Sequence, residues 1–517
     1  MEFLEGIKPR EYQQKIFETC KEKNCLVVLP TGLGKTLIAL MLTIERMKTF
    51  PGEKTVFLAP TKPLAEQHLQ SFSKYLPELF ADMQLFTGKV NSKQRKKIWQ
   101  TADIIFSTPQ CVANDLRKNL YALDEVCLLV EDEAHRCVKN YDYNFIAQKY
   151  KSQANHPRIL GLTASPGSEH DKIKSICKNL AIEEVELRTR ESDDVKKYLH
   201  EREFEKRIVQ FPPEFQEMKH VLGELFQRYI EELKIRNVLF GPVSKTGLIK
   251  LQKSISGTIS RGNRNFNYML GASACAQAIK IQHALELLET QTLVGFNTYL
   301  QKLFEQASKK QSKGVVKLVA KPEFNFVYMQ SNELLAKNAE HPKLAELKKI
   351  IEDEQTSNPK LKIIVFTQFR DTATAIAKKL NEIENINAKV FVGQVKKGTT
   401  GMNQKQQKQI IEDFSEGKIN ILCATCIAEE GLDIPEVNAV VFYEPIPSAI
   451  RTIQRAGRTA RLMAGKLIML ITKGTRDETS YYVSRSREKQ MHKAIGDIKE
   501  KLAKDGHLRE EKQGKLQ

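Results

Sequence analysis

The sequence predicts an α/β protein in which two tandem domains, each with a parallel β-sheet, flank an all-helical domain. Short β-branched runs alternate with helix-length segments at the start of the chain, and the same alternation returns after about residue 345. Between them only helical spacing of apolar residues is found. Buried strands that alternate with helices form parallel sheets covered on both faces. We therefore expect domains at 1–204, 205–344 and 345–485, and a charged C-terminal tail at 486–517.

Polar, glycine or proline residues follow each strand-like run of the first domain. The runs are 25–29, 55–59, 104–107, 126–130 and 159–162. Parallel sheets bind their ligands at the carboxyl ends of the strands. We therefore expect functional residues where these runs end. The second domain repeats the pattern with runs at 363–366, 389–392, 419–423, 439–442 and 467–471.

The segment between the two sheets is predicted to be helical and basic. Apolar residues recur at helical spacing over 218–233, and 274–306 is a second long helical stretch. No acidic residue lies between Asn237 and Leu285. A lysine face can serve solubility alone, but the exclusion of every carboxylate favours contact with nucleic-acid phosphates. The residues expected to make that contact are Lys245, Lys250, Lys253, Arg261 and Arg264.

The composition points to the same class of partner. The 517 residues include 81 Lys and Arg against 63 Asp and Glu, a formal net charge of +18, which favours polyanions. No run approaches the ~20 apolar residues of a spanning helix, and the acidic N-terminus lacks a signal-peptide core. The nine scattered cysteines are typical of reduced thiols, and the single CxxC pair (Cys423, Cys426) does not make a zinc site. We expect a soluble cytoplasmic protein with no membrane partner.

A glycine-rich loop, PTGLGKT at residues 30–36, follows the first run and opens a helix. Its backbone N–H groups and the helix N-terminus can hold a triphosphate. Lys35 supplies a charge to the β- and γ-phosphates, and the Thr36 hydroxyl can bind Mg²⁺. The strict pattern has glycine where this chain has Leu29. The residues expected to bind ATP here are Thr31, Gly32, Gly34, Lys35 and Thr36.

Two further motifs complete a phosphoryl-transfer site. The DEAH motif at 132–135 ends a strand-like run, so that Asp132 can hold Mg²⁺ and Glu133 can orient and deprotonate the attacking water. The QRAGRTAR motif at 454–461 places Arg458 and Arg461 on one helical face. We expect these arginines to reach the γ-phosphate across an interdomain cleft, although such a helix could also form surface salt bridges only.

The ordered motifs PTGLGKT, APTKPLAEQ, STPQ, DEAH, TAS, IVFTQ, ATCIAEEGLDIP and QRAGRTAR resemble those of superfamily 2 helicases. GIKPREYQ, NYDYNFIAQKY and FYEPIPSAIRTIQR are similar to the archaeal Hef and Fanconi anaemia group M branch of that superfamily. The resemblance implies two RecA-like motor domains with a thumb-like helical insert, and a nucleoid-associated enzyme.

The resemblance also implies roles for single residues. Gln13, with Arg10, contacts the adenine, and Gly431 and Asp433 lie near the ribose and γ-phosphate. Gln454 joins Lys35, Asp132, Glu133 and the two arginines as a catalytic residue. Thr163 and Ser165 couple the ATP state to the DNA. The residues implied to contact nucleic-acid phosphates are Thr61, Gly88, Thr108, Thr367, Gln368 and Thr425.

Three departures from the family pattern are visible. Ala460 replaces a usual glycine, and Glu131 precedes the DEAH motif where an apolar residue is usual. The nuclease motif ERK-x3-D that follows the motor in many Hef proteins is absent from this sequence. We therefore expect no nuclease activity, a monomeric motor, and a separate nuclease or sliding clamp as candidate partners.

The sequence thus predicts an ATP- and Mg²⁺-dependent DNA helicase or translocase that acts on forks and junctions in replication-fork repair and recombination. Two alternatives stay open. The first is a double-stranded-RNA-dependent ATPase like the RIG-I and Dicer helicases, which recognise A-form shape. The second is a DNA clamp that binds ATP without turning it over, whose sign would be the loss of Lys35, Glu133 or the arginines.

Overall fold

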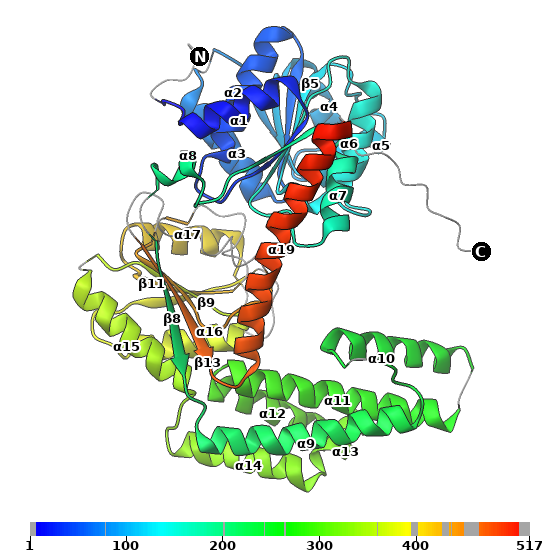
Figure 1. The fold of residues 1–517 in the computed structure, drawn as a ribbon, viewed down its shortest axis with the longest axis vertical. Coiled ribbons are helices and arrows are strands. Elements are labelled where there is room, and N and C mark those ends of the chain that lie inside the picture. Colours follow the sequence, from blue (N-terminus) through cyan, green and yellow to red (C-terminus); the bar gives the residue numbers. More distant parts are fainter. Residues whose placement is uncertain are drawn as a thin grey trace.

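The computed structural model describes residues 7–505 except 78, 200–201, 242, 263–264, 359, 394–401, 426–433, 436 and 449–464. It has two parallel sheets with helices on both faces and a separate helical domain, as the sequence predicts (Figure 1). Six predicted site residues fall outside the described residues. They are Arg264, Gly431, Asp433, Gln454, Arg458 and Arg461.

The first sheet has seven parallel strands in the order β3-β4-β2-β5-β6-β1-β7. Its strands are β1 (Cys25–Val28), β2 (Lys54–Leu58), β3 (Met83–Phe86), β4 (Ile104–Ser107), β5 (Val126–Asp132), β6 (Ile159–Thr163) and β7 (Glu184–Leu187). One face packs on α1 (Glu11–Glu22), α2 (Lys35–Thr49), α3 (Lys62–Tyr75) and α8 (Asp193–Lys196). The other packs on α4 (Ser92–Thr101), α5 (Pro109–Arg117), α6 (Asp142–Gln153) and α7 (His170–Asn179). The 3₁₀ turn η1 (Ala134–Arg136) follows β5.

The second sheet has six parallel strands in the order β10-β11-β9-β12-β13-β8. Its strands are β8 (Arg202–Val209), β9 (Ile363–Phe366), β10 (Ala388–Phe391), β11 (Ile421–Ala424), β12 (Ala439–Phe442) and β13 (Gly465–Thr472). α15 (Pro342–Ser357) and α16 (Arg370–Leu380) cover one face, and α17 (Gln404–Ser415) packs on the other.

Strand β8 corrects the predicted boundary between the first domain and the insert. The boundary at 204/205 divides this strand, yet the whole of β8 pairs with β13, from Arg202 opposite Gly465 to Val209 opposite Thr472. β8 lies at the sheet edge, where charged side chains are common because they discourage pairing with other chains. Its charged sequence, REFEKRIV, therefore lacks the apolar run that marked the other strands.

All the described elements between β8 and α15 are helices, and they have a core of their own. The insert contains α9 (Pro213–Ile235), α10 (Lys245–Ser260), α11 (Phe266–Thr290), α12 (Leu293–Ser308), α13 (Lys313–Val319) and α14 (Pro322–Ala336). The buried apolar faces of these helices form one cluster. In Figure 1 α9, α10 and α11 extend away from both sheets, and α10 lies on the side nearer the first domain.

The described part of the predicted C-terminal tail, residues 486–505, belongs to a long helix. α19 (Arg476–Asp505) leaves β13 and runs from the second sheet to the first domain (Figure 1). Met491, Ile495 and Ile498 on one side of it are buried in the core of the first domain. Helix α19 therefore joins the two sheet domains.

A buried ion pair fixes the junction of the insert, the second sheet and α19. The Lys343 ammonium, at the start of α15, donates to Asp477 Oδ2 at 2.8 Å and to the Thr290 carbonyl oxygen at 2.7 Å. It also lies 4.8 Å from the ring centre of Tyr443. Burial raises the pKa of Asp477, and the Lys343 charge opposes that effect.

The described cysteines are all free and buried, as expected for reduced thiols. Among the described residues, no group of three or more His, Cys, Asp or Glu side chains could hold a metal ion. None of the helices described here has the length and apolar composition needed to cross a membrane.

Candidate nucleotide site and nucleic-acid surface

The glycine-rich loop joins β1 to α2 in the geometry expected for a phosphate-binding loop. Gly32 and Gly34 have φ values of 84° and 80°, which other residues rarely adopt. A Cβ atom at Gly34 would lie 2.2 Å from the side-chain nitrogen of Gln13. The Lys35 ammonium donates to the Leu29 carbonyl oxygen at 2.8 Å, within the same loop. Leu29, where a glycine was expected, is fully buried.

The segment that contains the predicted adenine-binding residues is hydrogen-bonded to this loop. The Gln13 amide donates to the Leu33 carbonyl oxygen at 3.1 Å, and the Tyr12 hydroxyl donates to the same oxygen at 2.8 Å. Gln13 also accepts a hydrogen bond from the Arg10 backbone at 2.8 Å. Arg10 lies over the ring of Tyr198, 5.3 Å from its centre. Gln13 thus contacts the loop directly, and Arg10 contacts Gln13.

Asp132 lies at the end of β5 and is buried beside His68, a residue of α3. The His68 Nε2 atom is 2.8 Å from Asp132 Oδ2, and its Nδ1 atom is 3.5 Å from the Thr36 hydroxyl. Burial raises the pKa of Asp132, but the hydrogen bond to His68 and the nearby Lys35 charge outweigh it and hold the pKa below its usual value. The carboxylate is therefore ionised at neutral pH.

Glu133 follows in a left-handed conformation with φ of 51°, which turns the chain sharply after the strand. The Tyr143 hydroxyl donates to the Asp132 carbonyl oxygen at 2.7 Å and fixes this turn. A Glu133 carboxylate oxygen lies 3.2 Å from His135 Nδ1. The same nitrogen lies 3.2 Å from the Thr163 hydroxyl. The DEAH motif and the TAS motif are therefore in direct contact.

The TAS motif continues this connection to α19. The Thr163 hydroxyl donates to the Ser165 carbonyl oxygen at 3.0 Å and accepts from the Ser165 backbone at 3.1 Å. The Ser165 hydroxyl donates to the Met491 sulfur at 2.9 Å. Thr163 and Ser165 thus link the Glu133 carboxylate, through His135, to α19.

Glu131, which stands where an apolar residue is usual, is fully buried. Burial raises its pKa to about 8, and a contact with the Cys137 thiol lowers it slightly. At pH 7 the side chain is therefore mainly protonated. It adds no full negative charge beside the expected Mg²⁺ ligands.

The residues present fit a magnesium nucleotide. The Thr31 hydroxyl oxygen is buried with no hydrogen-bond partner among the described residues, as expected of a group that awaits a phosphate or water. Gly32 and Gly34 adopt the left-handed backbone that a phosphate-binding loop at a helix N-terminus uses. Thr36 and Asp132 offer hydroxyl and carboxylate oxygens, the hard ligands that Mg²⁺ prefers.

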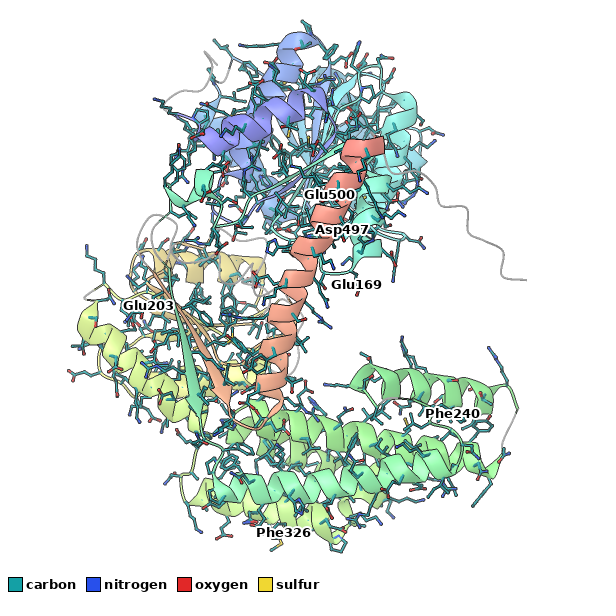
Figure 2. The ribbon with its side chains drawn as sticks, viewed as in Figure 1. Glu169, Glu203, Phe240, Phe326, Asp497 and Glu500 are labelled. Carbon is teal, nitrogen blue, oxygen red and sulfur yellow. The ribbon has the colours of Figure 1, made fainter. Side chains whose placement is uncertain are left out.

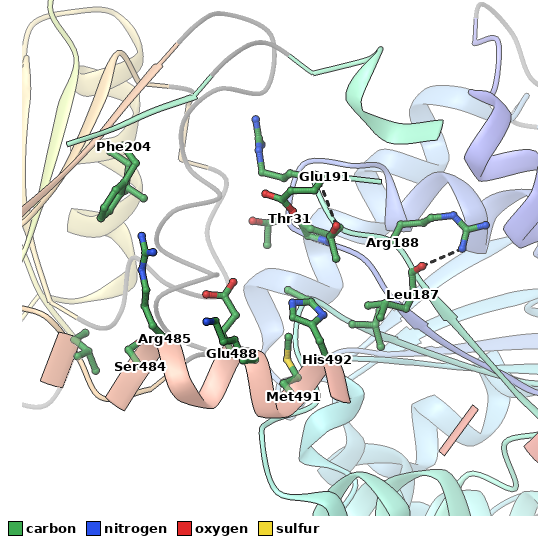
Figure 3. Close-up of a pocket in the computed structure, with 18 of the residues that line it drawn as sticks. Thr31, Leu187, Arg188, Glu191, Phe204, Ser484, Arg485, Glu488, Met491 and His492 are labelled. Carbon is green, nitrogen blue, oxygen red and sulfur yellow. Dashed lines mark hydrogen bonds between the residues drawn. The ribbon is translucent and has the colours of Figure 1, made fainter. Parts of the chain in front are cut away.

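A cavity of about 450 Å³ separates the glycine-rich loop from the second sheet (Figure 3). Thr31 and Ala164 line it from the first domain, and Ile446 and Met469 from the second. Arg485, Glu488 and His492 of α19 line a third side. Nucleotide bound by the loop would therefore face the second domain, where the sequence places the QRAGRTAR arginines.

Three predicted phosphate contacts lie at the carboxyl edge of the first sheet. Thr61 is exposed at the N-cap of α3, and Thr108 is half-buried at the N-cap of α5. Gly88 is exposed and shares with Thr108 a surface hollow of about 510 Å³ that Asn91 and Lys118 also line. Because helix N-termini carry partial positive charge, the hollow suits a phosphate backbone.

The phosphate contacts predicted in the second domain differ in their exposure. Gln368 is exposed, whereas Thr367 is fully buried and its hydroxyl lies 3.3 Å from both Gln291 Oε1 and Glu444 Oε1. In this structure Thr367 therefore holds the insert against the second sheet and does not offer its hydroxyl to a nucleic acid. Thr425 is also buried, at the end of β11.

The basic residues of the insert that are predicted to contact phosphates fall into two groups, exposed residues and one that is ion-paired. Lys250, Lys253 and Arg261 are exposed on α10 and at its end. Lys245 instead forms an ion pair with Glu286 of α11. Although burial raises the pKa of Glu286, hydrogen bonds from His283 and Lys245 hold it at about 2. Lys245 therefore supports the packing of α10 on α11.

Sequence reasoning missed two site residues, His68 and Tyr143. His68 stands one residue beyond APTKPLAEQ, and seven positions after Thr61, so both lie on the same side of α3. Tyr143 belongs to NYDYNFIAQKY, which carried the family resemblance without a role for the residue. Their spacing from known motifs was the available signal, but each contact joins elements that are distant in sequence.

Comparison with family models agrees with the division seen in the fold. Residues 10–173 match the DEAD/DEAH box helicase model, and residues 342–463 match the helicase conserved C-terminal domain. Residues 214–337 match a model described as the helical bundle of a putative ATP-dependent RNA helicase. The last match covers the region of helices α9 to α14.

One solved structure and several curated relatives match almost the whole of this chain. The crystal structure of the Hef helicase domain from Pyrococcus furiosus is 41% identical, covers 92% of this chain and 98% of its own, and superposes with a TM-score of 0.71. A putative ATP-dependent RNA helicase of Methanocaldococcus jannaschii is 37% identical over 95% of this chain and 61% of its own length. The mouse Fanconi anemia group M protein homolog is 32% identical over 94% of this chain and 26% of its own length.

The fungal ATP-dependent DNA helicase mph1 of Neurospora crassa is 34% identical over 91% of this chain and 41% of its own length. The chain thus spans about a quarter to three fifths of the length of these curated relatives. The similarity lies in the portion that contains both sheets and the helical insert.

Proposed function

Because this chain belongs to the Hef-type superfamily 2 helicases, we propose that it is an ATP-dependent DNA helicase or translocase that acts on branched DNA. The observation that carries the proposal is the continuous set of contacts from the glycine-rich loop through Asp132, Glu133 and His135 to Thr163 and α19. Relatives named as DNA helicases support the choice of DNA.

The chain's own residues divide the chemistry among them. Lys35 and the loop amides hold the phosphates, and Thr36 and Asp132 would hold Mg²⁺, which would neutralise charge on the phosphates. Glu133 orients the attacking water and takes its proton. His135 connects Glu133 to Thr163, so that a change at the γ-phosphate reaches α19. Arg458 and Arg461 are proposed to stabilise the transferring phosphoryl group.

Nucleic acid is proposed to bind along two surfaces. Thr61, Gly88 and Thr108 of the first domain contact the backbone of one strand without reading its sequence. The exposed Lys250, Lys253 and Arg261 of the insert hold a second arm of a fork or junction. Alternate grip by the two motor domains as the cleft closes and opens then moves the protein along the strand.

Steady-state ATPase tests the motor. Wild type and Glu133→Gln are compared with no nucleic acid, single-stranded DNA, forked DNA and duplex RNA at one salt concentration. We expect the greatest stimulation by forked DNA and a loss of at least ~10²-fold in the variant, because the variant lacks the general base. Lack of stimulation by every nucleic acid would leave the non-hydrolysing clamp.

Charge reversal tests the role of the insert. Lys250→Glu combined with Lys253→Glu is expected to remove the preference for forks while leaving single-strand-stimulated ATPase unchanged. The matched control is Lys309→Glu with Lys310→Glu, a basic pair after α12. Unchanged fork preference in the first variant would contradict the proposal.

A double-stranded-RNA-dependent ATPase is the second candidate. Two observations favour it: the helical bundle matches a model described as an RNA helicase, and the Methanocaldococcus jannaschii relative carries that description. A-form RNA is recognised by its shape and 2′-hydroxyls. Greater stimulation by duplex RNA than by forked DNA in the same assay would select it.

A further inference from the structure

The far end of the helical domain carries an unusual group of exposed apolar side chains. Ile235 ends α9, Phe240 lies on the segment after it, and Phe266 and Met269 lie in the first turn of α11. Their exposed fractions are 80%, 78%, 71% and 53%. We call these four residues the tip surface. Figure 2 shows Phe240 beside the ends of the long helices, remote from both sheets.

The tip surface is not a part of the core that failed to pack. Val238, two residues before Phe240, is buried, and a Cβ atom at Gly271 would lie 3.2 Å from one of its methyl groups. The Val238 backbone N–H donates to the Leu233 carbonyl oxygen at 3.1 Å. The backbone that carries Phe240 is thus held between α9 and α11, while its ring points outward. Exposed aromatic side chains on a fixed backbone are typical of a binding surface.

The surrounding charge indicates the chemistry of the occupant. No carboxylate occurs from Asn237 to Leu285, a stretch that contains Phe240, Phe266 and Met269. Lys250, Lys253 and Arg261 are exposed in the same stretch. A second copy of this chain would bring two acid-free basic surfaces together, which like charges oppose. Aromatic faces beside basic side chains instead match single-stranded nucleic acid, whose bases stack and whose phosphates are negative.

We propose that the tip surface binds unpaired bases at the branch point of the nucleic acid, with Phe240 and Phe266 as the stacking residues. This inference rests on the proposed function, since the motor supplies the branched substrate. Stacking needs no base sequence, because every base has an aromatic face. The insert therefore recognises a branch by its unpaired bases as well as by the direction of its second arm.

Binding without ATP separates this inference from the motor activity. Fork affinity is measured by fluorescence anisotropy for two DNA forks that differ only at the unpaired positions next to the branch, which hold either thymines or abasic residues. We expect wild type to bind the thymine fork about 5- to 100-fold more tightly, as stacking of one or two bases implies. Phe240→Ala with Phe266→Ala is expected to bind the two forks equally.

Two further variants keep the result interpretable. Phe326→Ala with Met329→Ala removes side chains of α14 that are 39% and 70% exposed. Figure 2 shows Phe326 apart from Phe240 on the helical domain. This control should retain the wild-type ratio. Phe240→Trp with Phe266→Trp should retain or increase it, because the indole also stacks.

Each outcome decides the question. Equal affinity of wild type for the two forks overturns the inference, even if the alanine variant fails to fold. A ratio that persists in the alanine variant also overturns it. A wild-type dimer in sedimentation that the alanine variant abolishes, together with equal fork affinities, would assign the surface to a second copy. A preserved fork ratio without DNA-stimulated ATPase would refute the motor proposal alone.

Discussion

At the scale of single residues, His68 connects the two expected ligands of Mg²⁺. Its ring lies 2.8 Å from Asp132 Oδ2 and 3.5 Å from the Thr36 hydroxyl, and it packs against Phe57 with ring centres 4.4 Å apart. A side chain that hydrogen-bonds to a metal ligand fixes the orientation of that ligand's lone pairs. His68 is therefore a positioning residue for Asp132. It lies on α3, whose N-cap is the expected nucleic-acid contact Thr61.

Replacement of His68 by alanine should weaken magnesium binding rather than nucleotide binding alone. We expect the Mg²⁺ concentration needed for half-maximal binding of a fluorescent ATP analogue to rise about 10- to 100-fold. Binding is measured by titration of Mg²⁺ at fixed nucleotide. His220→Ala, an exposed histidine of α9, is the matched control. An unchanged Mg²⁺ requirement in His68→Ala would show that Asp132 needs no such support.

Glu131 gives the fold a pH dependence of definite sign. Its pKa is about 8 in the folded chain and 4.5 in an ordinary environment, so the folded state holds a proton that the unfolded state releases. Stability from this group is present below pH 4.5 and is lost as pH rises to 8, by about 1.4 kcal/mol per pH unit. Glu131→Gln removes this loss. Its advantage in thermal stability over wild type should therefore grow between pH 5 and 8, and a constant difference would contradict the burial argument.

Most of the candidate nucleotide site could be named from the sequence because its motifs are local. The glycine-rich loop, Gln13, Asp132 and Thr163 all lie where the motifs imply. The contacts of Thr367 could not be predicted, because its partners Gln291 and Glu444 come from distant segments that no local pattern connects. The same reason explains why His68 was missed.

At the scale of elements, the junction of α11, α15 and α19 depends on one buried ion pair. The Lys343 and Asp477 side chains are 0% and 1% exposed, so water cannot solvate either charge if its partner is removed. Asp477 also accepts from the Thr472 backbone at 3.1 Å, which fixes the start of α19. The pair therefore sets the angle at which α19 leaves β13.

Loss of one partner should cost more than loss of both. We expect Lys343→Met to lower the free energy of unfolding by about 3–5 kcal/mol, because it leaves Asp477 buried without a counter-charge. Lys343→Met with Asp477→Leu should recover part of that loss. Guanidinium unfolding followed by circular dichroism provides the measurement, and Lys348→Met, from an exposed pair with Glu352, should change little. Additive losses would argue against a coupled pair.

Elements that follow the apolar pattern were predicted, and those that do not were missed. Strands β1, β2, β4, β5 and β6 are buried along their whole length, and each contains the apolar run by which it was predicted. β8 is an edge strand with a charged sequence, so only its pairing with β13 reveals it. In α19 the apolar residues stand at 491, 494, 495, 498 and 502, a helical spacing that the surrounding charges obscured.

At the scale of the whole molecule, α19 is the element on which the three domains meet. Its start contacts the insert, since the Arg476 backbone donates to Glu289 at 2.8 Å and its guanidinium donates to the Gln282 carbonyl oxygen at 3.1 Å. Its middle lines the cavity between the motor domains, and its end is buried in the first. A movement of either motor domain therefore displaces the helix that contacts Ser165 and the insert.

The same helix determines when the first domain can be completed during synthesis. Five residues of α19 belong to a core whose other buried members come from residues 26–185: Met491, Ala494, Ile495, Ile498 and Leu502. The ribosome delivers them only after the insert and the second sheet have been made. The first domain to emerge is therefore among the last to close its core. Until then, it exposes the apolar groove on which α19 will dock, and a chaperone could recognise that groove.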